Sequence, residues 1–468
     1  QKHRQQLFSL NYFVVILVGS LIRILLSHAP NLKRWLEHRV EIATPLTSWN
    51  RVLEGIFIKD SIGLASAYES DLVHEIPVML KIYKLLLALF GNQLISYAFI
   101  LVDILSATLM LMLAPRIINH MTRVETIEHQ SGKYKRLIDS FESEEECIKT
   151  MDKFLINTQT LNPTFWSHVA FAVLFLNPFS ICSCVAQSTI VIHNFILLLW
   201  FCFLLNNQTI LSFFFLALHA NITVYSLVFV VPSISFLIQK SVTHSLAPHK
   251  TNKLSIIIQH LALFFTLTAL VFGFNLFLED NSTRFIESTY LFILKVPDLI
   301  PNLGVFWYFF TEMFEHFRLF FTYVFQINVF IYTIPLTIRL RNDPIVNIFI
   351  QLGLISCLKS YPSVGETGFY LSFLPLLSYL FAYMRNIIVY SVMLIVSTIL
   401  APIMFYLWLG GGGGNANFYF AITLVYSIGQ IFLLVDIFYA SLKREFIKTN
   451  GAKIPKAKNG ASGVFSLE

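Results

Sequence analysis

Long apolar runs that lack any charged side chain place the strongest constraint on how this chain can fold. Leu254–Leu278 and Ile387–Leu409 contain no Asp, Glu, Lys or Arg. A helix that crosses a bilayer needs about 20 apolar residues, whereas a strand of a membrane barrel alternates apolar and polar residues. These runs are apolar all round, so they predict membrane-spanning α-helices, in which every backbone N–H and C=O is bonded within its own segment.

The composition extends this prediction to the whole chain. Hydrophobic residues make up 56% of it and charged residues only 13%, against about 25% charged residues in soluble domains. At about 20 residues per span, the sequence predicts an all-α, polytopic membrane helix bundle of about 11–12 spans. We treat residues 1–468 as a single membrane domain, with a lumenal or interfacial segment at 29–75, a cytosolic loop at 118–160 and a cytosolic tail at 443–468.

Within the first of these segments, four charged residues indicate a short amphipathic helix at the membrane surface. They are Arg34, Glu37, Arg39 and Glu41. The net charge of the whole chain is a modest +6. It fits Lys and Arg on the cytoplasmic side of a membrane protein. The sequence has no Arg-rich stripe and no RNA-binding motif, so we expect no nucleic-acid partner.

Known signatures of catalysis are missing from the sequence. The five cysteines form no CxxC pair, and there is no Ser-His-Asp signature, Walker motif or dinucleotide-binding fingerprint. We therefore expect no cofactor, no metal and no self-contained catalytic site in this chain.

The densest group of charges inside an apolar run lies in Phe306–Phe325. If the run is one helix, Glu312 and His316 are neighbours at i,i+4, and Glu315 and Arg318 are neighbours at i,i+3. Polar groups in a membrane are costly and so point to function. The group could be a local ion-pair cluster, a docking surface for a lipid head group or partner subunit, or a metal site, although E-x-x-x-H supplies only two ligands.

A second interruption is the five-glycine run Gly410–Gly414, which Asn415, Ala416 and Asn417 follow. Glycines let another molecule approach the backbone closely, and the two amide side chains can donate and accept hydrogen bonds. The segment is either a plain turn between helices or a contact for a polar ligand such as a sugar hydroxyl or a phosphate.

Several segments resemble the PIG-U family, which is subunit U of the glycosylphosphatidylinositol (GPI) transamidase. The resemblance runs from about Glu41 to Arg444 and is most specific in PNLGVFWYFFTEMFEHFRLFFTYVFQINVFIYTIP at Pro301–Pro335. The other segments are TPLTSWNRVLEG at Thr44–Gly55, HEIP at His74–Pro77, NPFSICSCVAQS at Asn177–Ser188, VPDLIP at Val296–Pro301, KSYPSVG at Lys359–Gly365 and NANFYFAIT at Asn415–Thr423.

This resemblance implies a multi-pass protein of the endoplasmic reticulum membrane, similar in architecture to the multi-span GPI mannosyltransferases. It implies a non-catalytic role in recognising the GPI lipid, beside other transamidase subunits that include the cysteine-protease subunit. The contact residues that it implies are Asn415 and Asn417 first, and then Phe306, Trp307, Tyr308 and Glu312.

We therefore expect helices that frame a lipid-accessible cavity, with acyl chains against Phe and Leu and the glycan head at a polar rim. The alternative is a lipid-linked, dolichol-phosphate-sugar-dependent mannosyltransferase that uses Glu69 or Asp71 as its carboxylate. A transporter would need paired discontinuous helices in two repeats, and the sequence shows only one glycine break of that kind.

Overall fold

The computed structural model describes residues 2–62, 67–70, 72–132, 156, 161–244 and 252–450, with side chains from residue 12 onward. Within these residues the chain forms helices and no strand. The acidic run Glu142–Glu146, Asp71 and the tail after Asn450 lie outside the described residues. The first part of the expected loop at 118–160 continues a long helix as far as Gln130.

Among the described residues, six helical segments are long and apolar enough to cross a membrane, and two bent helix pairs raise that number to eight. The six are α4 (Pro77–Gln130), η3 with α11 (Val224–Phe229 and Val230–His244), α12 (Lys253–Leu278), α16 with α17 (Glu315–Phe330 and Thr333–Arg339), α20 (Ile387–Leu409) and α21 (Ala416–Asn450). The bent pairs are α1 (Lys2–Ser27) with α2 (Pro30–Glu37), and α7 (Pro163–Leu176) with α8 (Pro178–Val185).

Four further apolar helices in the described part of the chain have only 10 to 17 residues. They are α9 (Ile190–Leu205), α10 (Thr209–Ile222), α18 (Pro344–Leu358) and η6 (Leu374–Tyr383). The all-α polytopic bundle is thus confirmed. Its full-length spans are fewer than the expected eleven or twelve, because several apolar runs form shorter helices.

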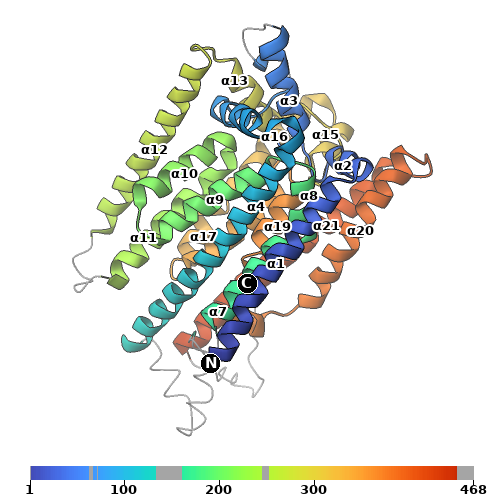
Figure 1. Ribbon diagram of the computed structural model, residues 1–468. Coiled ribbons are helices and arrows are strands. Elements are labelled where there is room, and N and C mark those ends of the chain that lie inside the picture. The colour runs from blue at the N-terminus through green and yellow to red at the C-terminus, as the bar shows by residue number, and fades with distance from the viewer. Residues whose placement is uncertain are drawn as a thin grey trace.

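Short helices complete the chain between these segments. They are α3 (Trp49–Phe57), η1 (Ile58–Ile62), η2 (Ala67–Glu69), α13 (Arg284–Ile286), η5 (Glu287–Leu291), α14 (Phe292–Lys295), α15 (Phe306–Glu312) and α19 (Val364–Leu371). α3, α13 and α15 gather at the upper end of the bundle, whereas α1 begins and α21 ends at the lower end (Figure 1).

Proline and asparagine set where the helices break. Asn177 ends α7, and its side chain accepts a hydrogen bond from the backbone N–H of Phe179 at the start of α8. Pro178 then occupies the first helical position, where a missing N–H costs nothing. The two helices meet at 43°. In α4 the break is Gly91, whose φ of 65° requires a residue without Cβ.

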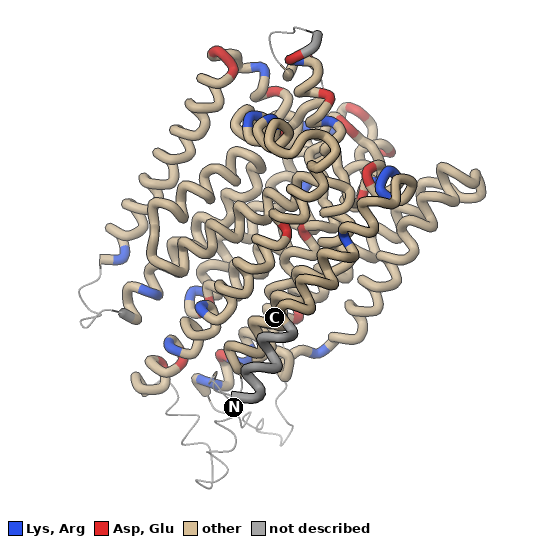
Figure 2. The backbone as a smooth tube through the Cα atoms, in the orientation of Figure 1, with Lys and Arg blue, Asp and Glu red and all other residues tan. Residues whose placement is uncertain are grey.

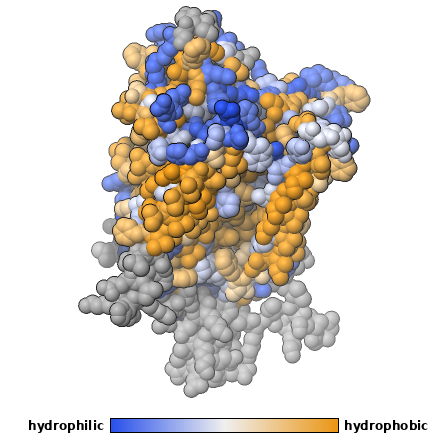
Figure 3. Space-filling model, turned by 45° about the vertical axis from the view of Figure 1, so that its right-hand side comes forward, coloured by the Kyte–Doolittle hydropathy of each residue, from blue (hydrophilic) through white to orange (hydrophobic). Residues whose placement is uncertain are grey.

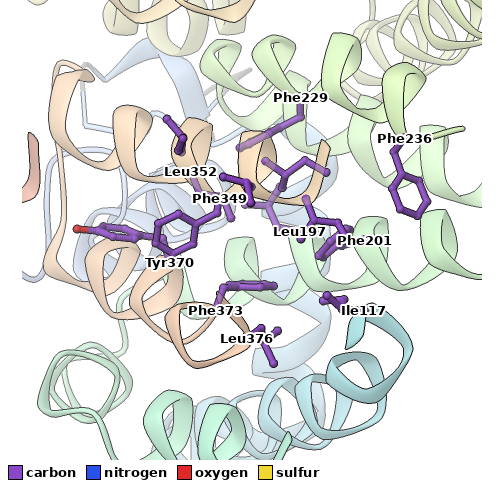
Figure 4. Close-up of a cluster of buried hydrophobic side chains, with 14 of the residues drawn as sticks. Ile117, Leu197, Phe201, Phe229, Phe236, Phe349, Leu352, Tyr370, Phe373 and Leu376 are labelled. Atoms are coloured by element: carbon purple, nitrogen blue, oxygen red, sulfur yellow. The ribbon is translucent and has the colours of Figure 1, made fainter. Parts of the chain in front are cut away.

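The core and the lipid-facing surface are both apolar, and charges lie mainly toward the two ends of the bundle (Figure 2). Buried side chains from α4, α9, η3, α18 and α19 meet in the cluster that Figure 4 shows. In contrast, only 17% of the most apolar window of α12 or α20 is buried. These helices expose apolar side chains almost all round. Their exposed faces therefore suit contact with lipid or with a partner subunit.

One ion pair lies between helices in the middle of the bundle. Arg23 of α1 is fully buried, and its Nε donates to Asp103 Oδ2 of α4 at 2.7 Å. The guanidinium also donates to the Gly19 carbonyl at 3.1 Å and lies 4.2 Å from the ring centroid of Phe175. This pair joins α1 to α4 where lipid could not solvate either charge.

Candidate functional site

The aromatic segment Phe306–Phe325 is not one helix. α15 ends at Glu312, Met313 is extended with φ −87° and ψ 145°, and α16 begins at Glu315. The expected pairing of Glu312 with His316 on one helical face is therefore wrong. The break lets α15 fold against α16, so that the Phe309 and Phe325 rings pack at 5.0 Å.

The expected pair of Glu315 and Arg318 is present, with 3.7 Å between its closest charged atoms. The Glu315 side chain is 86% exposed, so the pair contributes little to stability. Arg318 instead anchors the segment by donating to the Val296 carbonyl at 3.1 Å. No group of three or more potential metal ligands occurs among the described residues.

The two predicted contact regions come together through Tyr308. Its hydroxyl donates to Asn417 Oδ1, and its ring stacks on Phe420 with 4.2 Å between centroids. Asn417 also donates its backbone N–H to Asn415 Oδ1 at 3.1 Å. We call Tyr308, Asn415 and Asn417 the hairpin rim, because the two asparagines lie where α20 turns into α21 and Tyr308 of α15 contacts Asn417. Both asparagines are exposed, and their amide nitrogens have no protein partner in the described chain.

The glycine run shapes this turn. Gly410 and Gly411 donate to the Tyr406 carbonyl at 2.8 and 2.9 Å, and Gly413 donates to the Leu407 carbonyl at 3.0 Å, which caps the end of α20. Gly412 has a φ of 64°, which a residue with Cβ rarely adopts. The glycines thus close the helix end and leave the asparagine side chains in solvent.

Behind the hairpin rim lies an aromatic cluster. Trp307 is buried and packs against Trp408 at 6.0 Å and Tyr419 at 6.0 Å. Two other predicted contact residues lie elsewhere: Phe306 packs with Phe310 in a separate core cluster, and Glu312 is exposed at the end of α15. The structure therefore brings Trp307 to the hairpin rim but not Phe306 or Glu312.

Sequence reasoning missed the charged pair beneath this cluster. Arg39 Nε donates to Glu41 Oε2 at 2.9 Å, the Tyr419 hydroxyl donates to Glu41 Oε1 at 3.0 Å, and the Arg39 guanidinium lies 4.4 Å from the Phe405 ring centroid. Arg39 and Glu41 were expected on a surface helix, but α2 ends at Glu37 and both are buried. Because Tyr419 is so distant in sequence, no local pattern could reveal this contact.

An apolar cavity of about 180 Å³ adjoins the pair. Arg39 and Glu41 form its charged end, and its apolar wall includes Trp35, Phe179, Leu303, Pro402 and Tyr426. Ala401 lines the cavity and also belongs to the Trp307 cluster, so the cavity shares a wall with the aromatic cluster behind the hairpin rim. In Figure 3 the α20–α21 hairpin, at the right, stands apart from the rest of the hydrophobic surface. An apolar chamber below a polar rim suits an amphiphile with acyl chains.

Comparison with known proteins agrees with this architecture. The family model described as GPI transamidase subunit PIG-U matches residues 17–426. The human GPI-anchor transamidase component PIGU is 36% identical over 458 residues, which cover 97% of this chain and 99% of the human protein.

Two further relatives give the same result. The Mus musculus GPI-anchor transamidase component PIGU is 35% identical over 460 residues, which cover 97% of this chain and 99% of the mouse protein. The GPI transamidase component GAB1 of Saccharomyces cerevisiae is 30% identical over 420 residues, or 89% of this chain and 91% of the yeast protein. The helical membrane bundle, the family model and these near full-length relatives show that the chain belongs to the PIG-U family of GPI transamidase subunits.

Proposed function

We propose that this chain is a non-catalytic subunit of a GPI transamidase complex in the endoplasmic reticulum membrane, where it recognises the GPI lipid. Its partners would be the other transamidase subunits, including the cysteine-protease subunit. The observation that carries the proposal is the apolar cavity, which shares a wall with the aromatic cluster behind the hairpin rim. The names of the relatives, which are GPI transamidase components, support the assignment to that complex.

In this proposal the apolar cavity and the hairpin rim bind different parts of the lipid. An acyl chain lies in the apolar cavity. There, packed apolar side chains replace the water or the loosely packed lipid that surrounded it before binding. The sugar head lies at the hairpin rim, where the amide nitrogens of Asn415 and Asn417 donate to hydroxyl or phosphate oxygens. The Tyr308 ring gives the apolar face of a sugar a flat surface.

The non-catalytic part of the proposal rests on the nucleophiles and acids that the structure describes. Among the free thiols of the described residues, Cys184, Cys202 and Cys357 are buried and Cys182 is half-buried, and all four lie within helices. This is not the exposed, electropositive setting of a reactive cysteine. Glu69, the expected carboxylate of a mannosyltransferase, is bound in an ion pair with Arg284. The Glu69 carboxylate therefore already has a partner within the chain.

The hairpin rim is tested by the double variant Asn415→Ala/Asn417→Ala in cells that lack the native protein. We expect GPI attachment to a reporter protein to fall several-fold, while the protein level and co-purification of the cysteine-protease subunit stay unchanged. Asn450→Ala, an exposed asparagine at the far end of α21, is the matched control. Full GPI attachment in the double variant would remove the hairpin rim from the proposal.

Depletion of the protein separates the proposed role from the mannosyltransferase alternative. A transamidase subunit acts after the lipid is complete, so depleted cells should accumulate full-length GPI. Lipid extraction and glycan analysis measure this directly. Accumulation of a truncated glycan would contradict the proposed function whatever the result at the hairpin rim.

A further inference from the structure

The first turns of α4 form a short helix of their own. Gly91, with φ 65° and ψ 169°, breaks α4, and the chain before it, Pro77–Phe90, is helical. We call this segment the surface arm. It lies toward the upper end of the bundle, and the rest of α4 runs from there to the lower end (Figure 1). At about 20 Å long, the surface arm is too short to cross a hydrocarbon core of about 30 Å.

One face of the surface arm is fixed to the rest of the protein. Met79 and Tyr83 on this face are fully buried. The Tyr83 ring packs on Trp49 with 5.5 Å between centroids. At the start of the arm, the backbone N–H of Val78 donates to Asn275 Oδ1 of α12 at 3.0 Å. Because the inner face is docked in this way, the directions of the other faces are fixed as well.

A second face of the surface arm is apolar and exposed. Ile82, Leu85 and Leu89 follow one another at i, i+3 and i+7, which places them on one side of a helix. We call these three residues the apolar stripe. Leu85 is 59% exposed and Leu89 is 69% exposed. The apolar stripe therefore points away from the core of the protein.

A third face of the surface arm carries its charges. Lys81, Lys84 and Ala88 are exposed and have the same spacing as the apolar stripe, one residue earlier. Their face is therefore turned by about 100° from the apolar stripe. Lys84 lies 2.6 Å from Asp60, and both side chains of this pair are about half exposed. An apolar face beside a face that carries Lys is typical of a helix that lies in the surface of a membrane.

The surroundings of the surface arm agree with a position at the membrane surface. Trp35 of α2 and Tyr97 of α4 are both exposed, and exposed Trp and Tyr collect where a membrane meets water. Tyr97 lies roughly 9 Å along α4 from Gly91. Leu94, between these two residues, is exposed as well. Apolar exposure thus continues from the apolar stripe to the long part of α4, which crosses the membrane.

We propose that the surface arm binds the membrane leaflet at the upper end of the bundle, with the apolar stripe inserted among phospholipid molecules. Lys81 and Lys84 then face water and the lipid phosphates. The apolar stripe is purely aliphatic, which suits lipid, because protein interfaces are instead enriched in aromatic residues, Met and Arg. This inference depends on neither the hairpin rim nor the apolar cavity.

Photo-cross-linking identifies what covers the apolar stripe. The residue p-benzoylphenylalanine replaces Leu85 in the full chain, native membranes are irradiated, and the purified protein is analysed by mass spectrometry. We expect a phospholipid adduct, as at Leu101, an exposed residue on the long part of α4 that serves as positive control. The same replacement at Lys81 should give several-fold less lipid adduct. A cross-link from position 85 to another protein in place of lipid, or equal lipid adducts at positions 81 and 85, would overturn the inference.

Hydrogen exchange measures whether lipid contact holds the surface arm in place. Leu85→Gln/Leu89→Gln changes the apolar stripe and leaves the docked face intact. In phosphatidylcholine nanodiscs we expect backbone amides of the surface arm to exchange several-fold faster in this variant than in the native chain. Lys81→Gln/Ala88→Gln, on the charged face, is the matched control and should exchange as the native chain does. Unchanged exchange in the first variant, or an equal rise in both, would contradict the inference, and native exchange in α21 shows that each variant is folded.

Discussion

The Arg23–Asp103 pair makes a quantitative prediction about how α1 is held in the bundle. Asp103→Leu removes the carboxylate that pairs with Arg23 and leaves a fully buried guanidinium with the Gly19 carbonyl and the Phe175 ring. Leaving one partner of a buried pair uncompensated costs about 3–5 kcal/mol. The Phe175 contact offsets about 1 kcal/mol of this, so we expect a loss of about 3 kcal/mol.

The double variant Arg23→Leu/Asp103→Leu should be much more stable than the single variant. It removes both charges together, and replacing a buried ion pair by apolar residues is often neutral. We therefore expect its free energy of unfolding within about 1 kcal/mol of the native value. The free energy of unfolding is measured for the native protein, the single variant and the double variant by titrating each purified protein with SDS in mixed micelles.

Asp60→Asn is the control for this series. The Lys84–Asp60 pair is about half exposed, with side-chain exposures of 51% and 43%, so its loss should cost less than about 1 kcal/mol. The reasoning is refuted if Asp103→Leu costs no more than Asp60→Asn, or if the double variant is as unstable as Asp103→Leu.

Three further predictions concern contacts between helices. Gly353→Ile should lower the free energy of unfolding by about 1–3 kcal/mol, because a Cβ at Gly353 would lie 2.4 Å from Leu434 Cδ2 on α21. The control is Gly273→Ile, because a Cβ at Gly273 would meet open space. Tyr419→Phe should cost about 1–2 kcal/mol by the same measurement, since Glu41 loses a buried donor, and a variant as stable as the native protein would contradict this. Burial raises the pKa of Asp343, so this carboxyl destabilises the fold increasingly as the pH rises above its unfolded-state pKa of about 4. Asp343→Asn should therefore be more stable at neutral pH, with a gain that disappears at acidic pH in melts across the pH range.

Local hydropathy was enough to predict the helices that face lipid. The uncharged run Ile387–Leu409 coincides with α20, and Leu254–Leu278 lies within α12. These helices are apolar all round because their surroundings are apolar all round. Membrane-spanning helices satisfy their own backbone, so their positions need no knowledge of the tertiary fold.

The candidate site was only partly predictable. Tyr308, Asn415 and Asn417 were named from two separate segments, but nothing in the sequence showed that the Tyr308 hydroxyl meets Asn417. The same holds for Arg39 and Glu41, whose charges suggested a surface location. The free-energy cost of burying these charges is offset only when the fold brings Tyr419 and Phe405 into contact with them.

The packing of α20 has a consequence for how a lipid would reach the apolar cavity. α20 packs mainly against α21, and its residues Ser397, Ala401 and Pro402 form one wall of the cavity. α20 therefore separates the apolar cavity from the surroundings of the bundle, because only 17% of its most apolar window is buried.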